Sequence, residues 1–366
     1  MAAFWRRYNQ CFRVLSCLVL GVVLLDCPTA AAGFDCDQLY RISQNWQCRP
    51  KFPKMQDGKI IIMVQVSDGW VDFLENWLSF ARPHLKSECM QLAVIADDQT
   101  TMDAVKLIDF KSTGLPVSLI LANELKGGAS KKKFIRSNTD DIDKLNLPTP
   151  YGSKKYKDDM SMRPQEISFF LRKGCPVFFS DIDVVWRGDV FQELVNQNAG
   201  KKEANMYGYD DFDDGSVDRG KELCGGFIYF NPTHWTMKVV NEWADKLAQE
   251  HDTNQGPLNE IIKKTGGGFD EVQFLSREKI LNGKTAQLHW AQATVVHANW
   301  MIGKEKKKQF LKDRGLWHDG AELVRHRDDA SRDSDVEVEV TDKLLDKAAA
   351  VAVESTGHTA PISHHA

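Results

Sequence analysis

The hydrophobic positions along the chain follow two alternating patterns from residue 59 onward. Short β-branched and aromatic runs are separated by longer segments in which apolar residues recur every three or four positions, as on one face of a helix. The pattern predicts strands at 60–66, 91–96, 117–121, 176–186, 206–209, 227–231 and 294–297, and helices at 71–81, 102–110, 164–174, 233–249 and 257–264. Strands that alternate with helices in this way predict an α/β fold with a mostly parallel sheet flanked by helices.

Two further features refine this reading. Pro164 is predicted at the first position of its helix, where its missing N–H costs nothing, and Gly174 ends that helix. The stretch 123–160 is rich in lysine, aspartate and proline and has little core-forming content, so it is predicted to be a long surface excursion or lid. The segment 321–366 is charged and is predicted to be a disordered tail with one weak helix at 341–354.

The N-terminus resembles a secretory signal. Three arginines precede an apolar run at 14–25, and Asp26 interrupts that run before the small residues 29–33. The run is shorter than the roughly 20 apolar residues that span a bilayer, which favours a signal peptide cleaved after Ala32 over an uncleaved anchor in a Golgi membrane. Either alternative delivers the rest of the chain to the lumen of the secretory pathway. The predicted organisation is a signal peptide or anchor (1–32), a stem (33–58), one catalytic domain (59–320) and the tail (321–366).

Composition excludes one class of partner and permits disulfides. A net charge of −4 offers no overall attraction to nucleic acid. Five cysteines remain after residue 32, namely Cys36, Cys48, Cys89, Cys175 and Cys224. Disulfides are permitted in the secretory pathway, and the short polar loop between Cys36 and Cys48 makes these two the favoured pair within the stem. The odd count leaves at least one thiol free or paired with another chain.

Two carboxylates interrupt the apolar run at 176–186. Asp181 and Asp183 lie one residue apart between strand-like segments, and a carboxylate buried without a partner is costly. Side chains alternate along an extended strand, so both carboxylates are predicted to point the same way and to share one cation. Hard oxygen ligands favour Mg²⁺ or Mn²⁺, which proteins commonly bind together with the phosphates of a substrate such as a nucleotide diphosphate. A solvated turn is the alternative.

Two residues near the C-terminal end of the domain could complete such a site. His297 ends the last predicted strand and could add a nitrogen ligand that favours Mn²⁺, although a structural histidine is an alternative. Lys304 follows the flexible Gly303 and is well placed to pair with a phosphate. Lys306, Lys307 and Lys308 are interpreted as a solvated basic face.

Two further carboxylates follow predicted strands, where open α/β sheets bind ligands. Asp97 could contact the base or ribose of a nucleotide, or the pair Asp97 and Asp98 could cap the next helix. Asp210 is the best candidate for contact with a donor or acceptor sugar among the carboxylates that follow the strand 206–209, most of which are interpreted as solvated loop charge.

The chain resembles the nucleotide-diphospho-sugar transferases that include the plant rhamnogalacturonan-II xylosyltransferases and related arabinosyl- and galactosyltransferases. The likeness spans about residues 59–317. The residues that carry it are Asn76-Trp77-Leu78, the segment from Phe179 to Trp186, Gly226-Phe227-Ile228-Tyr229 with Pro232-Thr233, Gln255 with Leu258-Asn259, and Val296-His297-Ala298-Asn299-Trp300 with Gly303-Lys304.

The resemblance implies a single GT-A-type catalytic domain that is Rossmann-like, a nucleotide-sugar donor that is expected to be UDP-linked, and retaining transfer. It also implies a divalent metal on Asp181 and Asp183, with His297 as third ligand. Carbonyl or carboxylate groups near Asp210 and Gln255 would stabilise positive charge on the sugar. The chain departs from the resembling sequences at two positions. Asn254 stands where they often have Asp, and Cys224 where they often have Asn. Both positions would border the sugar site, so these departures bear on donor choice and on activity.

The leading hypothesis is a metal-dependent glycosyltransferase of the secretory pathway, in the Golgi lumen, that uses a glycan or glycoprotein acceptor. One alternative is a catalytically inactive relative that binds a nucleotide sugar or a glycan. The other is a metal-dependent phosphohydrolase, which normally uses a second metal cluster that this sequence does not suggest.

Overall fold

The computed structural model describes residues 35–42, 48–50, 55–67, 69–125, 152–211, 221–250 and 254–318. The predicted signal peptide or anchor (1–32), the charged tail (321–366), and residues 126–151 of the predicted surface excursion lie outside this part of the chain. Within the described residues, no helix combines the length and the apolar character that crossing a membrane requires.

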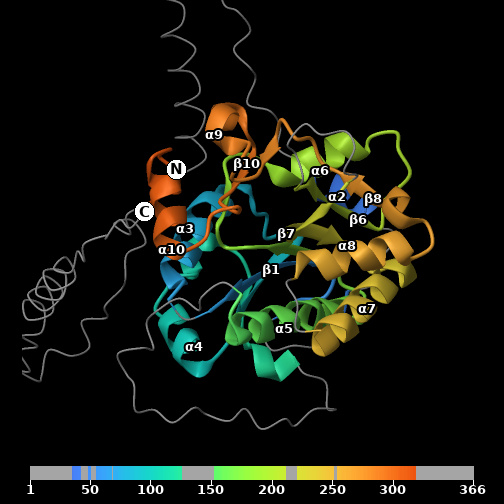
Figure 1. The fold of residues 1–366 in the computed structure, drawn as a ribbon, viewed down its shortest axis with the longest axis horizontal. Coiled ribbons are helices and arrows are strands. Elements are labelled where there is room, and N and C mark those ends of the chain that lie inside the picture. Colours follow the sequence, from blue (N-terminus) through green and yellow to red (C-terminus); the bar gives the residue numbers. More distant parts are fainter. Residues whose placement is uncertain are drawn as a thin grey trace, which may run out of the picture. The chain divides into compact units, whose positions relative to one another are not determined.

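A seven-stranded sheet forms the centre of the domain (Figure 1). Its strands are β1 (Ile60–Val66), β2 (Met90–Ala96), β3 (Val117–Leu121), β4 (Val177–Ser180), β6 (Met206–Asp210), β7 (Leu223–Phe230) and β8 (Val272–Phe274), in the spatial order β3-β2-β1-β4-β7-β6-β8. Only β7 runs antiparallel to its neighbours, β4 and β6. The predicted mostly parallel sheet flanked by helices is therefore confirmed.

A second, three-stranded sheet contains β5 (Val184–Trp186), β10 (Val295–His297) and β9 (Ile280–Leu281), in the order β5-β10-β9. β5 is antiparallel to β10, and β9 is parallel to it. Because β5 follows β4 almost directly in sequence, the chain passes from the large sheet to the small one within residues 181–183. This crossing carries the two predicted metal-binding carboxylates.

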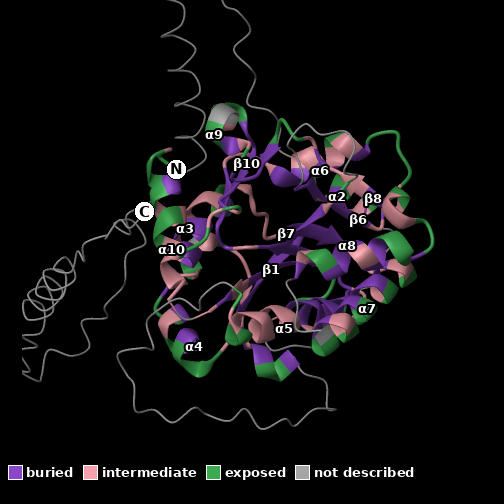
Figure 2. Cartoon of the chain, in the orientation of Figure 1, coloured by how far each residue is buried: buried purple, intermediate pink, exposed green. Residues whose placement is uncertain are grey.

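Helices cover both faces of the large sheet. The described helices are α2 (Cys36–Arg41), α3 (Val71–Ala81), α4 (Gln99–Val105), α5 (Lys154–Leu171), α6 (Val190–Asn198), α7 (His234–Glu250), α8 (Gln255–Lys264), α9 (Ala286–His289) and α10 (Lys304–Lys312). Successive residues of β1 belong to opposite cores: Ile60, Ile62 and Val64 pack with α3, whereas Ile61 and Met63 pack with α5 and α7. The central strands are buried and the helices expose their outer sides (Figure 2), as expected of a parallel sheet covered on both faces.

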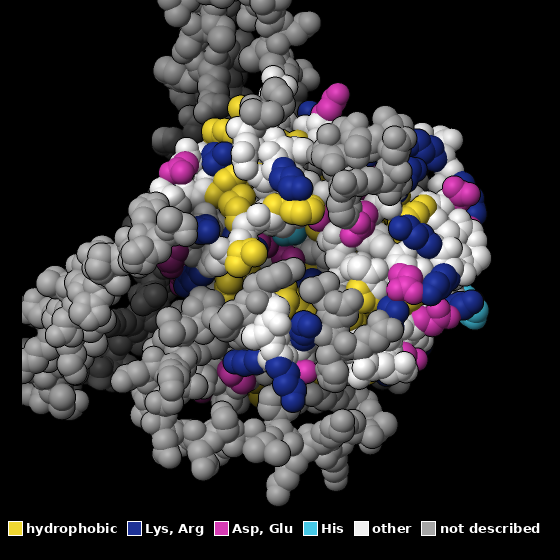
Figure 3. Space-filling view, in the orientation of Figure 1, with side chains coloured by type: hydrophobic (Ala, Val, Ile, Leu, Met, Phe, Trp, Pro, Cys, Tyr) yellow, Lys and Arg dark blue, Asp and Glu magenta, His cyan; other side chains and the backbone are white. Residues whose placement is uncertain are grey.

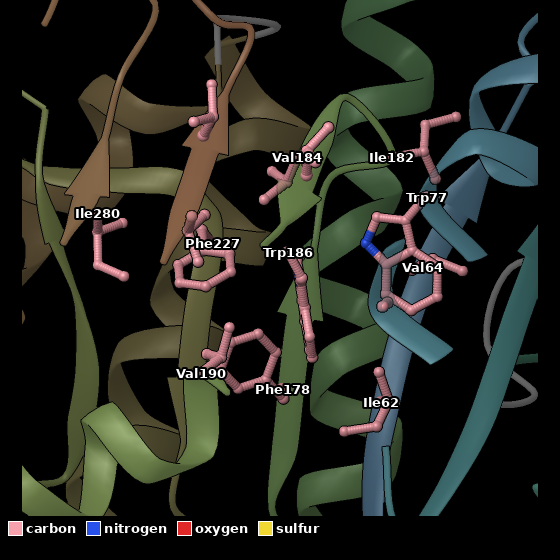
Figure 4. Packing of buried hydrophobic residues seen from close by; sticks show 14 of the residues in the cluster. Ile62, Val64, Trp77, Phe178, Ile182, Val184, Trp186, Val190, Phe227 and Ile280 are labelled. Atoms are coloured by element: carbon pink, nitrogen blue, oxygen red, sulfur yellow. The ribbon is translucent and has the colours of Figure 1, made fainter. Parts of the chain in front are cut away.

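Aromatic side chains fill the space between the two sheets (Figure 4). Trp186 of β5 packs edge-on against Trp77 of α3 and Phe178 of β4, with ring centroids 5.6 Å and 5.3 Å apart, and Phe178 also contacts Phe227 of β7 at 5.0 Å. The indole N–H of Trp77 donates to the hydroxyl of Ser180. This packing holds the end of β4, and therefore the crossing at 181–183, in a defined position.

Two predicted helix boundaries are wrong. α5 begins at Lys154, where Ser153 caps it by accepting from the backbone N–H of Tyr156, so Pro164 lies inside the helix. The apolar side of α5, including Ile167 and Phe170, is fully buried, and this packing offsets the hydrogen bond that an internal proline loses. α4 starts three residues before the predicted 102–110 helix because Asp98 caps it, and it ends at Val105.

The predicted pairing of Cys36 with Cys48 is also wrong. Cys36 is bonded to Cys89, directly before β2, and Cys48 to Cys175, two residues before β4. The short separation in sequence predicted a bond between Cys36 and Cys48. The fold instead places each of them beside the N-terminal end of a different strand, β2 for Cys36 and β4 for Cys48. Cys224 is a buried free thiol, in agreement with the odd number of cysteines.

Replacing both cysteines of either bridge by alanine is expected to lower the free energy of unfolding. A chain-entropy estimate gives a loss of about 5 kcal/mol for the Cys48–Cys175 bridge and about 4 kcal/mol for Cys36–Cys89, because the first closes the longer loop. Denaturant unfolding of the two double variants measures both losses. Non-reducing peptide mapping provides the direct check, and recovery of a Cys36–Cys48 peptide would contradict the structure.

Candidate functional site

The turn at 181–183 is attached to both sheets by backbone hydrogen bonds. The N–H of Asp181 donates to the carbonyl of Gly226 on β7 (2.7 Å), and the N–H of Ala298, which follows β10, donates to the carbonyl of Asp183 (2.9 Å). The expectation that the two carboxylates share one face of an extended strand is therefore wrong. They meet because the chain turns between β4 and β5.

Asp181, Asp183 and His297 form the candidate metal site. One ligand atom of each residue lies within 4.8 Å of the others. His297 Nε2 is 3.2 Å from Asp183 Oδ1 and 3.7 Å from Asp181 Oδ2. The antiparallel pairing of β10 with β5 places His297 opposite Val184 and so beside the turn. Two carboxylate oxygens and an imidazole nitrogen are a donor set that fits Mn²⁺ and, less specifically, Mg²⁺.

Two cations pair with the carboxylates from opposite sides. Arg163 of α5, itself 6% exposed, donates from Nη2 to Asp181 Oδ1 at 2.7 Å and from Nη1 to the carbonyl of Gly225. Lys307 of α10 forms an ion pair with Asp183 Oδ2. Burial acts to raise the pKa of Asp183, but Lys307 and His297 outweigh it and hold that pKa below its usual range.

The pKa of His297 is shifted in the opposite direction to that of Asp183. Burial acts to lower the pKa of the imidazole, but the adjacent carboxylate of Asp183 outweighs it and raises that pKa well above its ordinary value. The side chains of Asp183 and His297 are only 7% and 3% exposed. The carboxylates, Arg163, Lys307 and His297 thus form one compensated cluster of charges, in which Asp183, His297 and Arg163 are buried and the side chain of Asp181 is 27% exposed.

The lysines of α10 differ from their predicted roles. Lys304 Nζ lies 2.8 Å from Asp72 of α3, and Lys308 pairs with the other oxygen of the same carboxylate. Lys307 is the lysine that reaches the candidate metal site. The interpretation as a solvated basic face therefore holds for Lys306, which is exposed, and is wrong for Lys307 and Lys308, which form ion pairs. Phosphate binding by Lys304 stays a prediction.

Gly226 provides the space in which the site is packed. A Cβ atom built on this residue of β7 would lie 2.1 Å from Asp181 Oδ2 and 2.8 Å from His297 Cε1. Any larger residue would displace the carboxylate or the imidazole, so glycine is required here for close approach.

The second nitrogen of His297 faces a small polar network. Tyr209 Oη lies 2.7 Å from His297 Nδ1, Cys224 Sγ lies 3.6 Å from the same nitrogen, and Asn299 Nδ2 donates to Tyr209 Oη at 3.2 Å. Because Nε2 faces the carboxylates, a hydrogen bond from Nδ1–H to Tyr209 would leave Nε2 as the metal-binding nitrogen. Tyr209 is therefore a positioning residue for the imidazole.

Asp211 links this network to Gln255. Its Oδ1 accepts from Asn299 Nδ2 (2.7 Å) and Trp300 Nε1 (3.1 Å), and its Oδ2 accepts from Gln255 Nε2 (3.1 Å). The side-chain amide oxygen of Gln255 accepts from the backbone N–H of Gly225 at 3.0 Å, and the backbone carbonyl of Gly225 accepts from Arg163. Gln255 is therefore connected to the charged cluster, and its role beside the sugar stays a prediction.

Asp210, the carboxylate chosen from the sequence, is engaged differently. It forms an ion pair with Arg277 and accepts from the backbone N–H of Glu222 at 3.0 Å. A catalytic role for Asp210 stays a prediction, whereas the carboxylates of Asp211 and Glu222 both accept from Gln255 Nε2 at 3.1 Å.

Asp97 lies at the carboxyl end of β2, as predicted, and Gln65 Nε2 of the adjacent β1 donates to it at 3.2 Å. Burial, with the nearby carboxylate of Asp159 as the next contribution, raises the pKa of Asp97 to about 8. The capping alternative is confirmed for Asp98, which accepts from the N–H of Thr101 at 2.8 Å. Asp97 thus lies at the carboxyl-terminal edge of the sheet, where nucleotides are expected to bind, and its contact with a base or ribose stays a prediction.

The two departures from the resembling sequences both adjoin the charged cluster. Cys224 lies against His297, and the side-chain oxygen of Asn254, in the amide orientation that satisfies its neighbours, accepts from the guanidinium of Arg163. An aspartate at position 254 would compete with Asp181 for Arg163. The asparagine leaves the stronger, charged interaction of Arg163 to Asp181.

Sequence reasoning missed three residues of this site, Arg163, Lys307 and Tyr209, and it preferred Asp210 to the neighbouring Asp211. Arg163 precedes Pro164 and was excluded by the misplaced helix start. Lys307 belongs to a lysine run, in which only the helical spacing could single it out. Alternation along an extended chain carries a usable signal, because Tyr209 in β6 and Asp211 directly after β6 are two residues apart and so share the face opposite to that of Asp210.

The surface around the site is hollowed. Figure 3 shows a histidine and acidic side chains at the floor of a depression on this face, with hydrophobic and basic side chains on its rim. An acidic floor and a basic rim suit a ligand that carries both a cation and phosphate groups.

Replacing Tyr209 by Phe is expected to weaken Mn²⁺ binding by about 10- to 100-fold, because outer-shell partners of a histidine ligand contribute about that much to metal affinity. Tyr207→Phe is the matched control, since it removes a buried hydroxyl from the same strand but one that contacts Asn198 and Ala204. Titration calorimetry of both variants measures the effect. Equal Mn²⁺ affinity in the two would contradict a positioning role for Tyr209.

Replacing Asp97 by Asn is expected to flatten the pH dependence of stability. Asp97 in the folded protein keeps its proton up to about pH 8, whereas the unfolded chain loses it near pH 4. The folded state therefore binds the extra proton between these values, and stability falls there by up to about 1.4 kcal/mol per pH unit. Urea unfolding from pH 5 to 8 should show a smaller decline in the variant, and parallel curves would refute the shift.

Comparison with known proteins identifies the family. The model of the family described as nucleotide-diphospho-sugar transferase matches residues 129–311. A UDP-D-xylose:L-fucose alpha-1,3-D-xylosyltransferase of Arabidopsis thaliana is 25% identical over 284 residues, which cover 70% of this chain and 69% of the relative. A UDP-galactose:fucoside alpha-3-galactosyltransferase of Dictyostelium discoideum is 22% identical over 197 residues, which cover 46% of this chain and 29% of the relative.

Among solved structures, the galactosyltransferase LgtC in complex with donor and acceptor sugar analogues is similar over 73% of this chain and 99% of its own, with 12% identity and a TM-score of 0.43. The family match covers half of the chain and includes both the turn at 181–183 and His297. This chain therefore belongs to the nucleotide-diphospho-sugar transferase family and is a glycosyltransferase.

Proposed function

We propose that this protein transfers a pentose or hexose from a UDP-sugar to a glycan acceptor, with a divalent cation held by Asp181, Asp183 and His297. The observation that carries the proposal is the convergence of these three side chains with Arg163 and Lys307 in one charged cluster. A divalent cation bound there would neutralise the diphosphate as negative charge builds on it.

The two basic side chains supply a second source of positive charge. In the structure Arg163 and Lys307 are paired with the carboxylates. We propose that Lys307 takes the phosphate-binding role predicted for Lys304, because it lies next to Asp183, whereas Lys304 is held by Asp72. Lys307 would turn from the carboxylate to a phosphate oxygen once the carboxylate has another positive partner.

The sugar side of the site is proposed to lie near Gln255 and Asp211. Their oxygens can stabilise the positive charge that develops on the sugar when the diphosphate leaves. Asp211 takes this role more directly than Asp210, because it contacts Gln255. Transfer with retention of configuration, implied by the family resemblance, is part of this proposal, and the anomeric configuration of the product, measured by NMR, tests it.

The acceptor is proposed to be an L-fucose residue of a glycan. The xylosyltransferases and the galactosyltransferase that resemble this chain use different donor sugars, but the names of both include fucose or fucoside as acceptor. A location in the lumen of the secretory pathway, in the Golgi, is consistent with the two disulfides of the described residues, which are favoured in an oxidising compartment.

Asp183→Asn is expected to reduce metal-dependent UDP release by about 10²- to 10³-fold, as the loss of one essential electrostatic contact typically does. The assay incubates the purified protein with UDP-xylose, UDP-galactose and related donors plus methyl α-L-fucoside and Mn²⁺, with EDTA in parallel. Asp189→Asn is the matched control, because asparagine caps α6 as well as the native aspartate does. Full activity of Asp183→Asn, or activity that EDTA does not reduce, would overturn the metal-dependent mechanism.

A further inference from the structure

Trp300 has an unusual backbone conformation. Its φ angle is +61°, and among the described residues no other non-glycine residue has a positive φ. A bulky aromatic residue is strained in this left-handed region, and such strain persists only where the surroundings enforce it. Strained residues concentrate at ligand-binding sites, so the function of this side chain needs an explanation.

The surroundings hold Trp300 from several directions. Its indole N–H donates to Asp211 Oδ1 (3.1 Å), and Lys284 Nζ lies 3.5 Å from the ring centroid. The preceding residue, Asn299, accepts from the N–H of Gly283 at 2.8 Å. Gly283 has no room for a Cβ, which would lie 1.9 Å from the carbonyl oxygen of Asn299. The loop is therefore packed tightly enough to fix the ring.

The ring is nevertheless held partly in solvent. Trp300 is 45% exposed and Ile302, two residues later, is 65% exposed, and they are two of the three large hydrophobic side chains that the described residues expose. A strained backbone that leaves nearly half of an aromatic residue exposed gains only part of the stabilisation that full burial of its apolar area would give. An aromatic ring fixed in this way is suited to stack against a ligand.

The ring lies on the sugar side of the proposed site. One carboxylate, Asp211, joins Trp300 through Oδ1 to Gln255 through Oδ2. In the other direction, Asn299 donates both to Asp211 and to Tyr209, whose hydroxyl contacts the metal-binding candidate His297. Asp211 thus bridges Trp300 and Gln255, the residue predicted to stabilise the transferred sugar. Trp300 is not one of the carboxylates and cations proposed to bind the metal ion and the diphosphate.

We infer that Trp300 is the platform for the acceptor sugar, and that its exposed ring stacks against the C–H bonds of a 6-deoxyhexose. This inference rests on the proposed function and deepens it. A 6-deoxyhexose such as fucose replaces a polar hydroxymethyl group by a methyl group, and the exposed apolar side chain of Ile302, two residues after Trp300 in sequence, suits that methyl group. Lys284 approaches the ring and fixes its orientation through a cation–π contact.

The test measures binding of methyl α-L-fucoside to the purified protein saturated with Mn²⁺ and UDP, by saturation-transfer NMR and by titration. Trp300→Ala is expected to weaken fucoside binding by about tenfold, which corresponds to about 1.4 kcal/mol. Trp300→Phe keeps an aromatic face and should stay within about threefold of the wild type. Trp235→Ala is the matched control, because Trp235 of α7 is another tryptophan whose indole N–H donates to a backbone carbonyl, that of Gly266.

Unchanged fucoside affinity in Trp300→Ala, or no binding of the fucoside to the wild type, would overturn the inference. An equal loss in Trp300→Phe and Trp300→Ala would also overturn it, because the hydrogen bond to Asp211 would then matter and the ring would not. UDP affinity in the presence of Mn²⁺ should be the same in all variants, since the platform is assigned to the acceptor.

A structural role is separated from binding by a fourth variant. Trp300→Gly removes the ring and relieves the positive φ, so it should unfold at a higher temperature than Trp300→Ala while binding the fucoside as weakly. Normal fucoside binding by Trp300→Gly would contradict the platform. Failure of the wild type to release UDP from any donor would end the proposed function, whereas fucoside binding that depends on Trp300 would still support the platform.

Discussion

The structure depends on the compensation of two carboxylates at the point where the chain crosses between sheets. Asp181 and Asp183 lie in the turn between β4 and β5, and removing such groups from water without partners costs several kcal/mol each. Arg163, Lys307 and His297 supply the compensation from α5, α10 and β10. Because these partners come from elements far apart in the sequence, the cluster joins the middle and the C-terminal parts of the domain around one site.

The same balance of charge explains how the site could work. A group of carboxylates that already holds positive side chains can exchange them for a metal ion at little cost, because the ion provides the compensation that those side chains provided. Gly226 keeps the cluster tight, since its missing side chain leaves room for Asp181 and His297 to approach β7. Stability and the proposed chemistry therefore depend on the same contacts.

A chain of hydrogen bonds connects the charged cluster to the surface. It runs from His297 to Tyr209, then to Asn299, Asp211 and finally Trp300. Buried polar networks of this kind rigidify a site only when each member is satisfied, and Asp211 accepts from several donors at once. The metal side and the proposed acceptor side of the site are thus parts of one network, which fixes the distance between them.

The sequence by itself determined the class of fold and the core of the site. Short apolar runs that alternate with helical segments predicted a mostly parallel sheet. Burial of β1 and β2 on both faces agrees with this, because a parallel sheet covered by helices requires continuous apolar strands. Two carboxylates within an apolar run predicted a cation site, because isolated buried charge is costly.

Only the tertiary structure decided which partners they have. The disulfides of Cys36 and Cys48, the start of α5 and the choice of Lys307 over Lys304 depend on packing between segments distant in sequence. Local spacing carries no information about such contacts, because they form only when the whole chain has folded.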